Sequence, residues 1–502
     1  MNPSYAVVIP TIGRPSLNRL LTALCDGDRL PAGEVIIVDD RPGPARPLWP
    51  EAGVLPVTVL RSGGRGPAAA RNVGWRAARA DWICFLDDDV VPGEDWCARL
   101  ETDLRAAGPE VVGSQATIVV PVPADRRPRD DERRTLRLSD ARWITADMAY
   151  RRDALVACGG FDERFPRAYR EDADIALRLT RAGGRITDGS RESVHPIPPR
   201  TSALRTALSS VIAQRGNRDD ALMRRKHGRG WRSAIGEGPG RLPLHLASCG
   251  AALLALLALS TGRRAMLRAA AASWLGLTAE CALRRIAAGP RSGREIAAMA
   301  VSSALIPPVA VAHRIAGAVR FRNAPAEPPL AVLLDRDDTL IQDGPYLADP
   351  AGVVPLPHAR RALARLRRHG LRLAVVSNQS GVAKGLISPE QLAAVNSRVD
   401  ELLGPFDSWQ VCQHDDGDGC GCRKPAPGLV SAAAEALEVA PRRCVMIGDT
   451  GGDVAAALAA DADAILVPTR RTRTAEIADA RANAAVARSL NAAVSLVLKG
   501  IR

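Results

Sequence analysis

The stretch AVLLDRDDTL, residues 331–340, decides the fold of the C-terminal part of the chain. Its first four residues are apolar and predict a buried strand, and Asp335 and Asp337 follow where that strand ends. One carboxylate at such a position can attack phosphorus. The other, two residues on, can protonate the leaving oxygen and later activate water. We expect a divalent cation there, because it would suppress the repulsion between the acids and shield an incoming phosphate.

Three segments farther along the chain carry side chains that suit the same phosphoryl group. AVVSNQSG places Ser377 and Asn378 at a second strand end, as donors to phosphate oxygens. CRKP supplies Arg423 and Lys424, and the lysine is a compact charge suited to phosphate. VMIGDTGGD places Asp449 after another strand, as a third metal-binding carboxylate. Four such motifs in this order predict a Mg²⁺-dependent phosphatase.

This order of motifs resembles the haloacid dehalogenase superfamily of phosphatases. Within it, DRDDTL, DGPYL and SNQSGVAKG resemble the branch that contains D-glycero-D-manno-heptose 1,7-bisphosphate phosphatase and histidinol phosphatase, over about residues 329–470. The resemblance implies that Asp335 is the nucleophile and Asp337 the acid/base. It also implies that Mg²⁺ is held by the side chains of Asp335 and Asp449 and by the carbonyl of Asp337. Lys384 often corresponds to an arginine in the branch and is expected near the substrate phosphate.

One residue departs from that branch. Asp338 stands where the branch usually has glycine, and an extra carboxylate there could weaken phosphate binding or point to solvent. One alternative is therefore a C-terminal domain that serves as a zinc-stapled scaffold without turnover. Two others are a histidinol-phosphate phosphatase and a phosphatase of polynucleotide ends, and the last leaves the N-terminal motifs unexplained.

A cysteine cluster precedes Lys424. Cys412, His414, Cys420 and Cys422 supply three thiolates and an imidazole within one loop, which is a common ligand set of structural Zn²⁺. We expect the ion to fix the loop so that Lys424 points at the phosphate; free thiols are the alternative interpretation. Cys444 lies in an apolar run and is predicted to belong to the core.

The N-terminal part places acids after strands in the same way. The strand in IIVDD ends at Asp39 and Asp40, and DWICFLDDDVVP places three further acids, residues 87–89, after a buried strand. The carboxyl ends of parallel strands are where α/β folds bind nucleotides. Adjacent carboxylates repel one another, and Mg²⁺ or Mn²⁺ holding a diphosphate would compensate.

Together these motifs resemble the inverting family 2 glycosyltransferases of GT-A fold, over about the first 200 residues. The resemblance implies a nucleotide-sugar site and a direct metal ligand at Asp89. His195, in SVHP, is expected near that metal. Asp172, in GGFDERFPRAYREDADIALRL, is the expected general base for the acceptor hydroxyl. The residues expected to contact the nucleotide sugar are Asp39, Asp40, Arg71, Asn72, Asp87 and Asp88.

The amino-acid composition changes between the transferase motifs and the phosphatase motifs. We predict a transferase domain at 1–235, an Ala/Leu-rich helical region at 236–322 and a phosphatase domain at 329–500, after the Pro-rich linker FRNAPAEPP. Residues 242–262 are 21 residues without a formal charge, enough to cross a bilayer, whereas 296–312 carry Pro307 and Pro308. An apolar stretch at 269–279 is too short to span. Membrane association is therefore expected, with a buried helical bundle as the alternative.

The composition limits the partners. The net charge is +13, but the basic residues are dispersed and no aromatic-basic motif accompanies them, so we expect no nucleic acid partner. No signal peptide is evident at MNPSYAVVIP, which favours the cytoplasm, at the inner face of the membrane. The sequence thus predicts two Rossmann-like α/β domains joined by a helical segment. Together they form a bifunctional enzyme with a nucleotide-sugar donor, a sugar-phosphate substrate and a glycan or lipid-linked acceptor.

Overall fold

The chain forms two compact units, Met1–Arg322 and Asn323–Arg502. This computed structural model describes residues 3–44, 46–48, 50–197, 199, 201–342, 344 and 346–500. Asp343 and Pro345 of the DGPYL motif therefore lie outside the described residues. Each unit has its own sheet and its own apolar cores, so each is described by itself.

The first unit is built on an eight-stranded sheet in the order β3-β2-β1-β4-β7-β6-β8-β5. Strands β3, β2, β1 and β4 run parallel, and β7 pairs antiparallel with both β4 and β6. The parallel half carries the carboxyl ends at which nucleotides bind in α/β folds. The strands are β1 Tyr5–Thr11, β2 Val35–Asp39, β3 Val57–Arg61, β4 Trp82–Leu86, β5 Val91–Pro92, β6 Val111–Val119, β7 Asp147–Arg151 and β8 Arg185–Val194.

Alternate residues of the central strand face two different cores. Val7 and Ile9 of β1 belong to one apolar cluster, and Ala6 and Val8 belong to another. Because successive side chains of a strand point to opposite faces, the sheet has a buried core on each side. The helices of this part are α1 Ser16–Asp26, α2 Pro67–Ala77, α3 Trp96–Ala106, α4 Asp130–Leu136, α5 Arg152–Cys158, α6 Glu171–Arg181, α7 Ala203–Ala213, α8 Gly216–His227 and α9 Trp231–Ala234.

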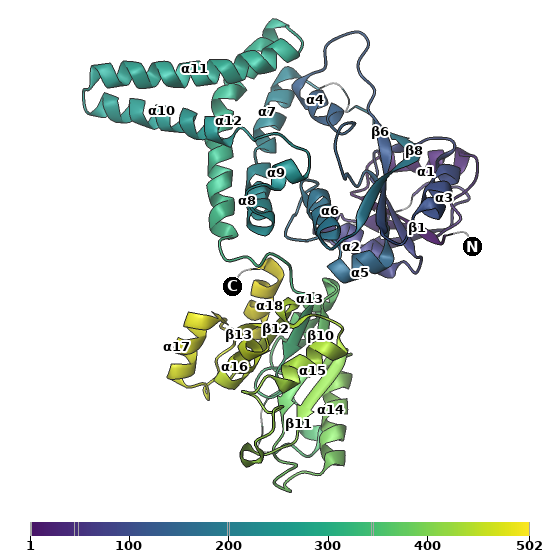
Figure 1. Cartoon of the computed structure of the whole chain (residues 1–502), viewed down its shortest axis with the longest axis vertical. Coiled ribbons are helices and arrows are strands. Elements are labelled where there is room, and N and C mark those ends of the chain that lie inside the picture. The colour runs from purple at the N-terminus through teal and green to yellow at the C-terminus, as the bar shows by residue number, and fades with distance from the viewer. Residues whose placement is uncertain are drawn as a thin grey trace. The chain divides into compact units, whose positions relative to one another are not determined.

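Three long helices complete the first unit. These are α10 Leu242–Ser260, α11 Arg264–Ala288 and α12 Gly293–Arg320, and α12 is continuous through Pro307 and Pro308. In Figure 1, α10 and α11 run side by side as an antiparallel pair, and both contact α12. By length and composition, α10 and α12 are apolar enough to cross a bilayer.

The second unit is a six-stranded, all-parallel sheet in the order β11-β10-β9-β12-β13-β14. Val332 and Leu334 of β9 face one core, and Ala331 and Leu333 face the other, so AVLL is a strand buried on both faces. The strands are β9 Ala331–Leu334, β10 Arg372–Asn378, β11 Ser408–Cys412, β12 Cys444–Gly448, β13 Asp463–Leu466 and β14 Ala485–Val486.

Helices cover both faces of this second sheet. Local capping fixes several of their starts: Ser388 accepts a hydrogen bond from the backbone N–H of Gln391, with Pro389 in the first turn of α14. The helices are α13 Ala359–Arg368, α14 Pro389–Leu403, α15 Gly428–Ala436, α16 Gly451–Ala459, α17 Thr474–Asn483 and α18 Leu490–Lys499, with 3-10 turns at Pro350–Gly352, Asp416–Asp418 and Pro441–Arg443.

The predicted fold class, two α/β domains and a helical segment, is confirmed. The structure places the helical segment in the same compact unit as the first sheet. The domain boundaries at 235, 322 and 329 stay a prediction.

Candidate functional site

A buried lysine joins two acids at the carboxyl ends of β9 and β12. Lys424 Nζ donates to Asp335 Oδ1 and to Asp453 Oδ1, each at 2.5 Å, and to the carbonyl of Val376 at 2.8 Å. Asp335, Asp449 and Asp453 each offer a carboxylate oxygen, and these oxygens lie within 4.8 Å of one another. At an effective dielectric constant of about 20, two carboxylates about 5 Å apart repel by roughly 3 kcal/mol, so one lysine does not neutralise three acids.

Burial and the neighbouring carboxylates both raise the pKa values of acids in this cluster. Burial raises the pKa of Asp335, and the ammonium of Lys424 partly offsets this. Burial and the charges of Asp453 and Asp338 raise the pKa of Asp449 to about 7. Hard oxygen ligands in this number fit Mg²⁺. The donor set is therefore compatible with a divalent cation.

Asp337 lies beside this cluster and is held by two neighbours. Arg336 donates from Nε to Asp337 Oδ1 at 3.1 Å and from Nη2 to Oδ2 at 3.0 Å. Gln379 Nε2 donates to the same Oδ2 at 2.6 Å and to Ser377 Oγ at 2.8 Å. The buried hydroxyl of Ser377 is thus linked to the expected acid/base through Gln379.

The other expected phosphate contacts are divided between two places. Asn378 holds the backbone of Lys424 from both sides, donating to its carbonyl at 3.0 Å and accepting from its N–H at 3.1 Å. Lys384 pairs with Asp415 at 3.2 Å, and Arg423 donates to Asp416 at 2.5 Å. Lys384 and Arg423 therefore bind acids of the cysteine loop, whereas Asn378 orients Lys424.

Asp338 has a left-handed backbone, with φ of 52°. Such a conformation favours glycine, and another residue there costs of order 1 kcal/mol. Arg471 Nη1 lies 3.8 Å from Asp338 Oδ2. In the same loop Thr469 donates to Asp449 Oδ2 at 3.3 Å. The extra carboxylate therefore lies between an arginine and the acid cluster.

The four residues of the cysteine cluster converge. Their sulfur–sulfur distances are 3.4 to 3.7 Å, and His414 Nδ1 lies 3.5 Å from Cys412 Sγ and 3.3 Å from Cys422 Sγ. Ligands about 2.3 Å from a tetrahedral Zn²⁺ are separated by similar distances. Lys424 follows two residues after Cys422. The donor set and its geometry fit one zinc ion.

In the first unit, Asp39 and Asp40 are used inside the protein. Arg41 donates to the two carboxylate oxygens of Asp39 from Nε and Nη2, each at 2.8 Å, and this pairing lowers the pKa of Asp39. Asp40 accepts from the hydroxyl of Ser62 at 2.6 Å and from two backbone N–H groups, those of Arg65 and Gly66, at 2.9 Å. Both acids therefore shape the loops at the ends of β2 and β3.

The three acids after β4 each have a cationic neighbour. Arg71 Nη2 donates to Asp87 Oδ1 at 2.7 Å. Arg14 Nη1 donates to Asp88 Oδ1 at 3.2 Å and to Asp89 Oδ2 at 2.8 Å. His195 Nε2 lies 3.5 Å from Asp89 Oδ1, a separation that suits two ligands of one Mg²⁺ or Mn²⁺.

Arg71 also joins the strand-end acids to the start of α6. Its Nη1 donates to Glu171 Oε1 at 3.0 Å, and both side chains are 2% exposed. Burial and the charge of Asp172 raise the pKa of Glu171 to about 8. Burial also raises the pKa of Asp172, which brings a carboxylate closer to the range of a general base.

Asn72 is structural in this arrangement. Its amide donates to the carbonyl of Phe161 at 2.8 Å and to Glu163 at 3.0 Å. The amide oxygen accepts from Trp75 Nε1 and from the backbone N–H of Phe161, each at 2.9 Å. All four hydrogen bonds of this side chain are thus made within the protein.

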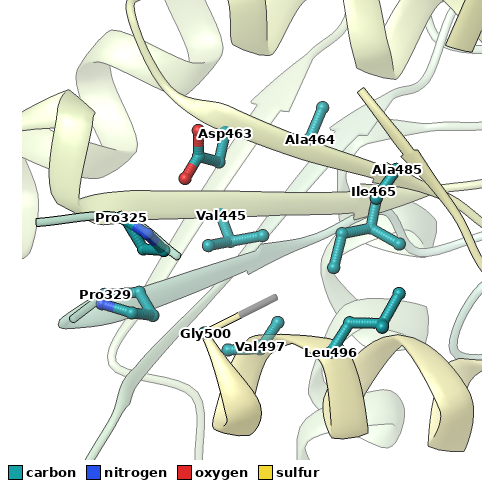
Figure 2. A pocket seen from close by; sticks show the side chains of 10 residues that line it. All are labelled: Pro325, Pro329, Val445, Asp463, Ala464, Ile465, Ala485, Leu496, Val497 and Gly500. Carbon is teal, nitrogen blue, oxygen red and sulfur yellow. The ribbon is translucent and has the colours of Figure 1, made fainter. Parts of the chain in front are cut away.

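A small apolar cavity lies elsewhere in the second unit (Figure 2). It is lined by Val445 near the start of β12, by Asp463 at the start of β13 and by α18. The acids Asp335 and Asp449 follow the opposite, carboxyl ends of β9 and β12. The cavity is therefore separate from the acid cluster.

Sequence reasoning missed several residues that the structure places at these sites, among them Arg14, Arg41, Arg336 and Gln379. Arg14 and Arg41 follow the ends of β1 and β2, and Arg336 stands between two expected catalytic acids. Proximity to a strand end was a usable signal for these three. Gln379 follows Asn378 directly, and nothing in the sequence connects it with Asp337.

Comparisons with known proteins agree with this division. Residues 6–161 match the family model of glycosyl transferase family 2, and residues 421–493 match the model of HAD-hydrolase-like proteins. A D-glycero-beta-D-manno-heptose-1,7-bisphosphate 7-phosphatase of Pseudomonas putida is 36% identical over 143 residues, which are 28% of this chain and 82% of that protein.

Two solved structures are also similar. The D,D-heptose 1,7-bisphosphate phosphatase of B. bronchiseptica, complexed with magnesium and phosphate, is 28% identical and covers 34% of this chain and 98% of its own, with a TM-score of 0.31. S. aureus TarS is 14% identical and covers 48% of this chain and 46% of its own, with a TM-score of 0.28.

The two family models and the curated relative confirm the two resemblances seen in the motifs. The chain is a fusion of a transferase domain and a phosphatase domain. It carries a family 2 glycosyltransferase domain in its first unit, and its second unit makes it a member of the HAD-like phosphatase family that includes the heptose-bisphosphate phosphatases.

Proposed function

We propose that the second unit hydrolyses a sugar phosphate of the heptose-bisphosphate type through an aspartyl-phosphate on Asp335. The observation that carries this proposal is the cluster of Asp335, Asp449 and Asp453, in which Asp335 and Asp453 bind the ammonium of Lys424. The relatives' substrate supports the choice of a sugar bisphosphate.

In the proposed reaction a carboxylate oxygen of Asp335 attacks phosphorus, and the bond from phosphorus to the sugar oxygen breaks. Asp337 gives its proton to that oxygen and then takes one from the water that hydrolyses the aspartyl-phosphate. Lys424 and Ser377 contact the phosphoryl oxygens, and Asn378 holds Lys424 in place. Mg²⁺, when held by Asp335, Asp449 and the carbonyl of Asp337, supplies charge neutralisation.

For the first unit we propose metal-dependent transfer of a sugar from a nucleotide-sugar donor to a glycan or lipid-linked acceptor. Asp89 and His195 would hold Mg²⁺ or Mn²⁺, which would supply stabilisation of the leaving diphosphate. Asp87 and Asp88 would face the donor, and Asp172 would take the proton of the acceptor hydroxyl. Arg71 fixes the start of α6 relative to Asp87.

We further propose that the Cys412–Cys422 loop binds structural Zn²⁺ and that both active sites work at the cytoplasmic face of a membrane. The thiolate and imidazole set supports the first statement. The apolar helices α10 and α12 support the second.

A second candidate function is supported by Asp338, whose charge adds to the burial and the Asp453 charge that raise the pKa of Asp449. In this alternative the second unit is a zinc-stapled scaffold without turnover. A phosphate-release screen of the full chain with Mg²⁺ separates the two. It would use sugar monophosphates, sugar bisphosphates and histidinol phosphate.

We expect phosphate release from a sugar bisphosphate that Asp335→Asn abolishes while sugar transfer persists. Asp89→Ala should abolish transfer and leave phosphate release unchanged. If Asp335→Asn does not diminish phosphate release, the reaction does not pass through an aspartyl-phosphate on Asp335. If the wild type releases phosphate from none of the esters, the scaffold alternative is favoured.

A further inference from the structure

The largest group of exposed apolar side chains in the described part of the first unit lies on the hairpin formed by α10 and α11, residues 242–288. Leu253, Leu256 and Leu259 of α10 are 66%, 63% and 64% exposed. In the same hairpin, Leu254 is half exposed, and Leu257 and Leu275 are more than half exposed. Contiguous apolar surface of this kind marks a binding face in a soluble protein.

The base of the hairpin is anchored in the transferase unit. Arg285 of α11 donates to the hydroxyls of Ser302 and Ser303 on α12 at 2.8 and 2.9 Å, and to Asp130 of α4 at 2.9 Å. Arg241, before α10, pairs with Glu280 of α11. The helices α10 and α11 extend away from this base (Figure 1), so their far half is held only by each other.

Helix α12 is packed differently, although it is also long and apolar. It contacts α7 and α8. A Cβ at Gly317 would lie 2.5 Å from the carbonyl oxygen of Arg218, so the two helix backbones approach closely there. Ser303, Ile306 and Ala310 are buried. Helix α12 therefore packs one face against the body of the unit, although Val301, Ile315 and Val319 on it stay more than half exposed. Among the described residues, the hairpin carries the larger group of exposed apolar side chains.

The charges identify the kind of surface that would cover the hairpin. Residues 236–322 contain eleven arginines, three glutamates, and neither aspartate nor lysine. Helix α10 itself carries no acidic or basic side chain other than His245. Arg263, Arg264 and Arg268 cluster at the exposed tip. An apolar face bordered by arginines is complementary to a bilayer with anionic headgroups.

The same arginines decide how the hairpin enters the bilayer. Helix α10 is about 28 Å long, close to the hydrocarbon thickness of about 30 Å. A spanning hairpin would carry the three tip arginines across the membrane, against the tendency of basic residues to stay on the cytoplasmic side. If the hairpin lies along one leaflet, the tip arginines and those of α11 can reach the headgroups of that leaflet.

We propose that the α10–α11 hairpin is a monotopic anchor that inserts α10 into one leaflet of an anionic membrane. This inference rests on the proposed cytoplasmic location and on neither of the two proposed chemistries. It assigns membrane binding to α10 and α11 together, with α12 as their support. It keeps both catalytic units on one side, where a lipid-linked acceptor would be within reach of the transferase.

Tryptophan quenching tests the insertion on the full chain. Trp274 of α11 is the one tryptophan between residues 236 and 322, out of eight in the chain. With vesicles of phosphatidylcholine and phosphatidylglycerol that contain brominated lipid, we expect part of the emission to be quenched. The Trp274→Phe variant should lose that quenched part. An unquenched wild type, or quenching that survives in Trp274→Phe, would overturn the proposal.

Flotation with the same vesicles tests which residues bind. The exposed substitutions Leu253→Glu and Leu256→Glu together should reduce binding at least tenfold, since they remove no buried packing. The matched control is Val54→Glu, because Val54 is 75% exposed and lies before β3. Equal binding to vesicles of phosphatidylcholine alone would contradict the role of the arginines.

Two further measurements exclude other arrangements. A membrane-impermeant maleimide trapped inside the vesicles should not label a Thr261→Cys variant, whereas labelling would show that the tip crosses and would overturn the monotopic arrangement. Light scattering in the absence of lipid should show no dimer of the wild type that the double substitution Leu253→Glu and Leu256→Glu converts to monomer. Such a dimer would assign the hairpin to a second copy of the chain.

Discussion

The Nζ atom of Lys424 lies 2.5 Å from Asp335 Oδ1, and both side chains are buried. The two residues are 89 positions apart, and the same ammonium also binds Asp453 at 2.5 Å. Asp453 is itself fixed by the capping of α16, because its Oδ2 accepts from the hydroxyl of Thr450 at 2.7 Å. The ammonium of Lys424 thus lies between Asp335, the expected nucleophile, and Asp453 in the first turn of α16.

We predict that Lys424→Arg lowers the kcat of phosphate release by about two orders of magnitude. A planar guanidinium is larger than an ammonium and does not fit among three close acceptors. The measurement is steady-state phosphate release with Mg²⁺ for the variant and for Lys499→Arg, a control at the end of α18. Equal kcat values for Lys424→Arg and the wild type would show that the contact with Asp335 is not catalytic.

Asp338→Gly should improve phosphate release. Removing one negative charge near the acid cluster is worth about 1 kcal/mol, or roughly fivefold in KM. Glycine also tolerates φ of 52°, so the free energy of unfolding should rise by about 1 kcal/mol. Asp338→Asn is the control, since it removes the charge and keeps the side chain. It should lower KM without a comparable gain in stability, and an unchanged KM in both variants would refute the charge effect.

Metal analysis should find about one zinc ion per chain, as expected for one Cys₃His set. Cys420→Ser should lose it and should destabilise the second unit, because zinc binding contributes to folding free energy in such loops. Phosphate release should fall with it, since the loop leads to Lys424. Cys25→Ser, in the first unit, should retain the zinc. Wild-type protein without zinc would remove this site.

Glu171 should make stability depend on pH. Its pKa is raised from 4.5 to about 8 by burial and by Asp172, so between these values the folded state holds more protons than the unfolded state. The free energy of unfolding should therefore fall as pH rises from about 4.5 to about 8. Urea unfolding at several pH values in that range gives the free energy of unfolding. Its decrease with rising pH should be smaller for Glu171→Gln than for the wild type. If the substitution leaves the pH dependence of the free energy of unfolding unchanged, Glu171 is ionised in the folded protein.

Much of the fold and of both candidate sites could be predicted from the sequence. The segments AVLLDRDDTL and DWICFLDDDVVP predict a buried strand followed by acids, and both form such strands, β9 and β4. This worked because parallel strands align their carboxyl ends at one edge of a sheet, so local patterns far apart in the chain point to a common place. The Cys412–Cys422 spacing likewise predicted a convergent set, since one short loop holds all four residues.

Only the tertiary structure decided which side chains pair. The carboxylate of Asp39, which the resemblance places at the nucleotide, binds Arg41, and Arg71 joins Asp87 to Glu171, which lies 100 positions after Arg71. Such pairings depend on strand register and on where loops fold back, which local sequence does not encode. The sequence also showed three apolar segments between 236 and 322 and ranked them only by length and proline content. Their packing separates them further, because α12 is held against α7 and α8, whereas α10 and α11 carry the larger group of exposed leucines.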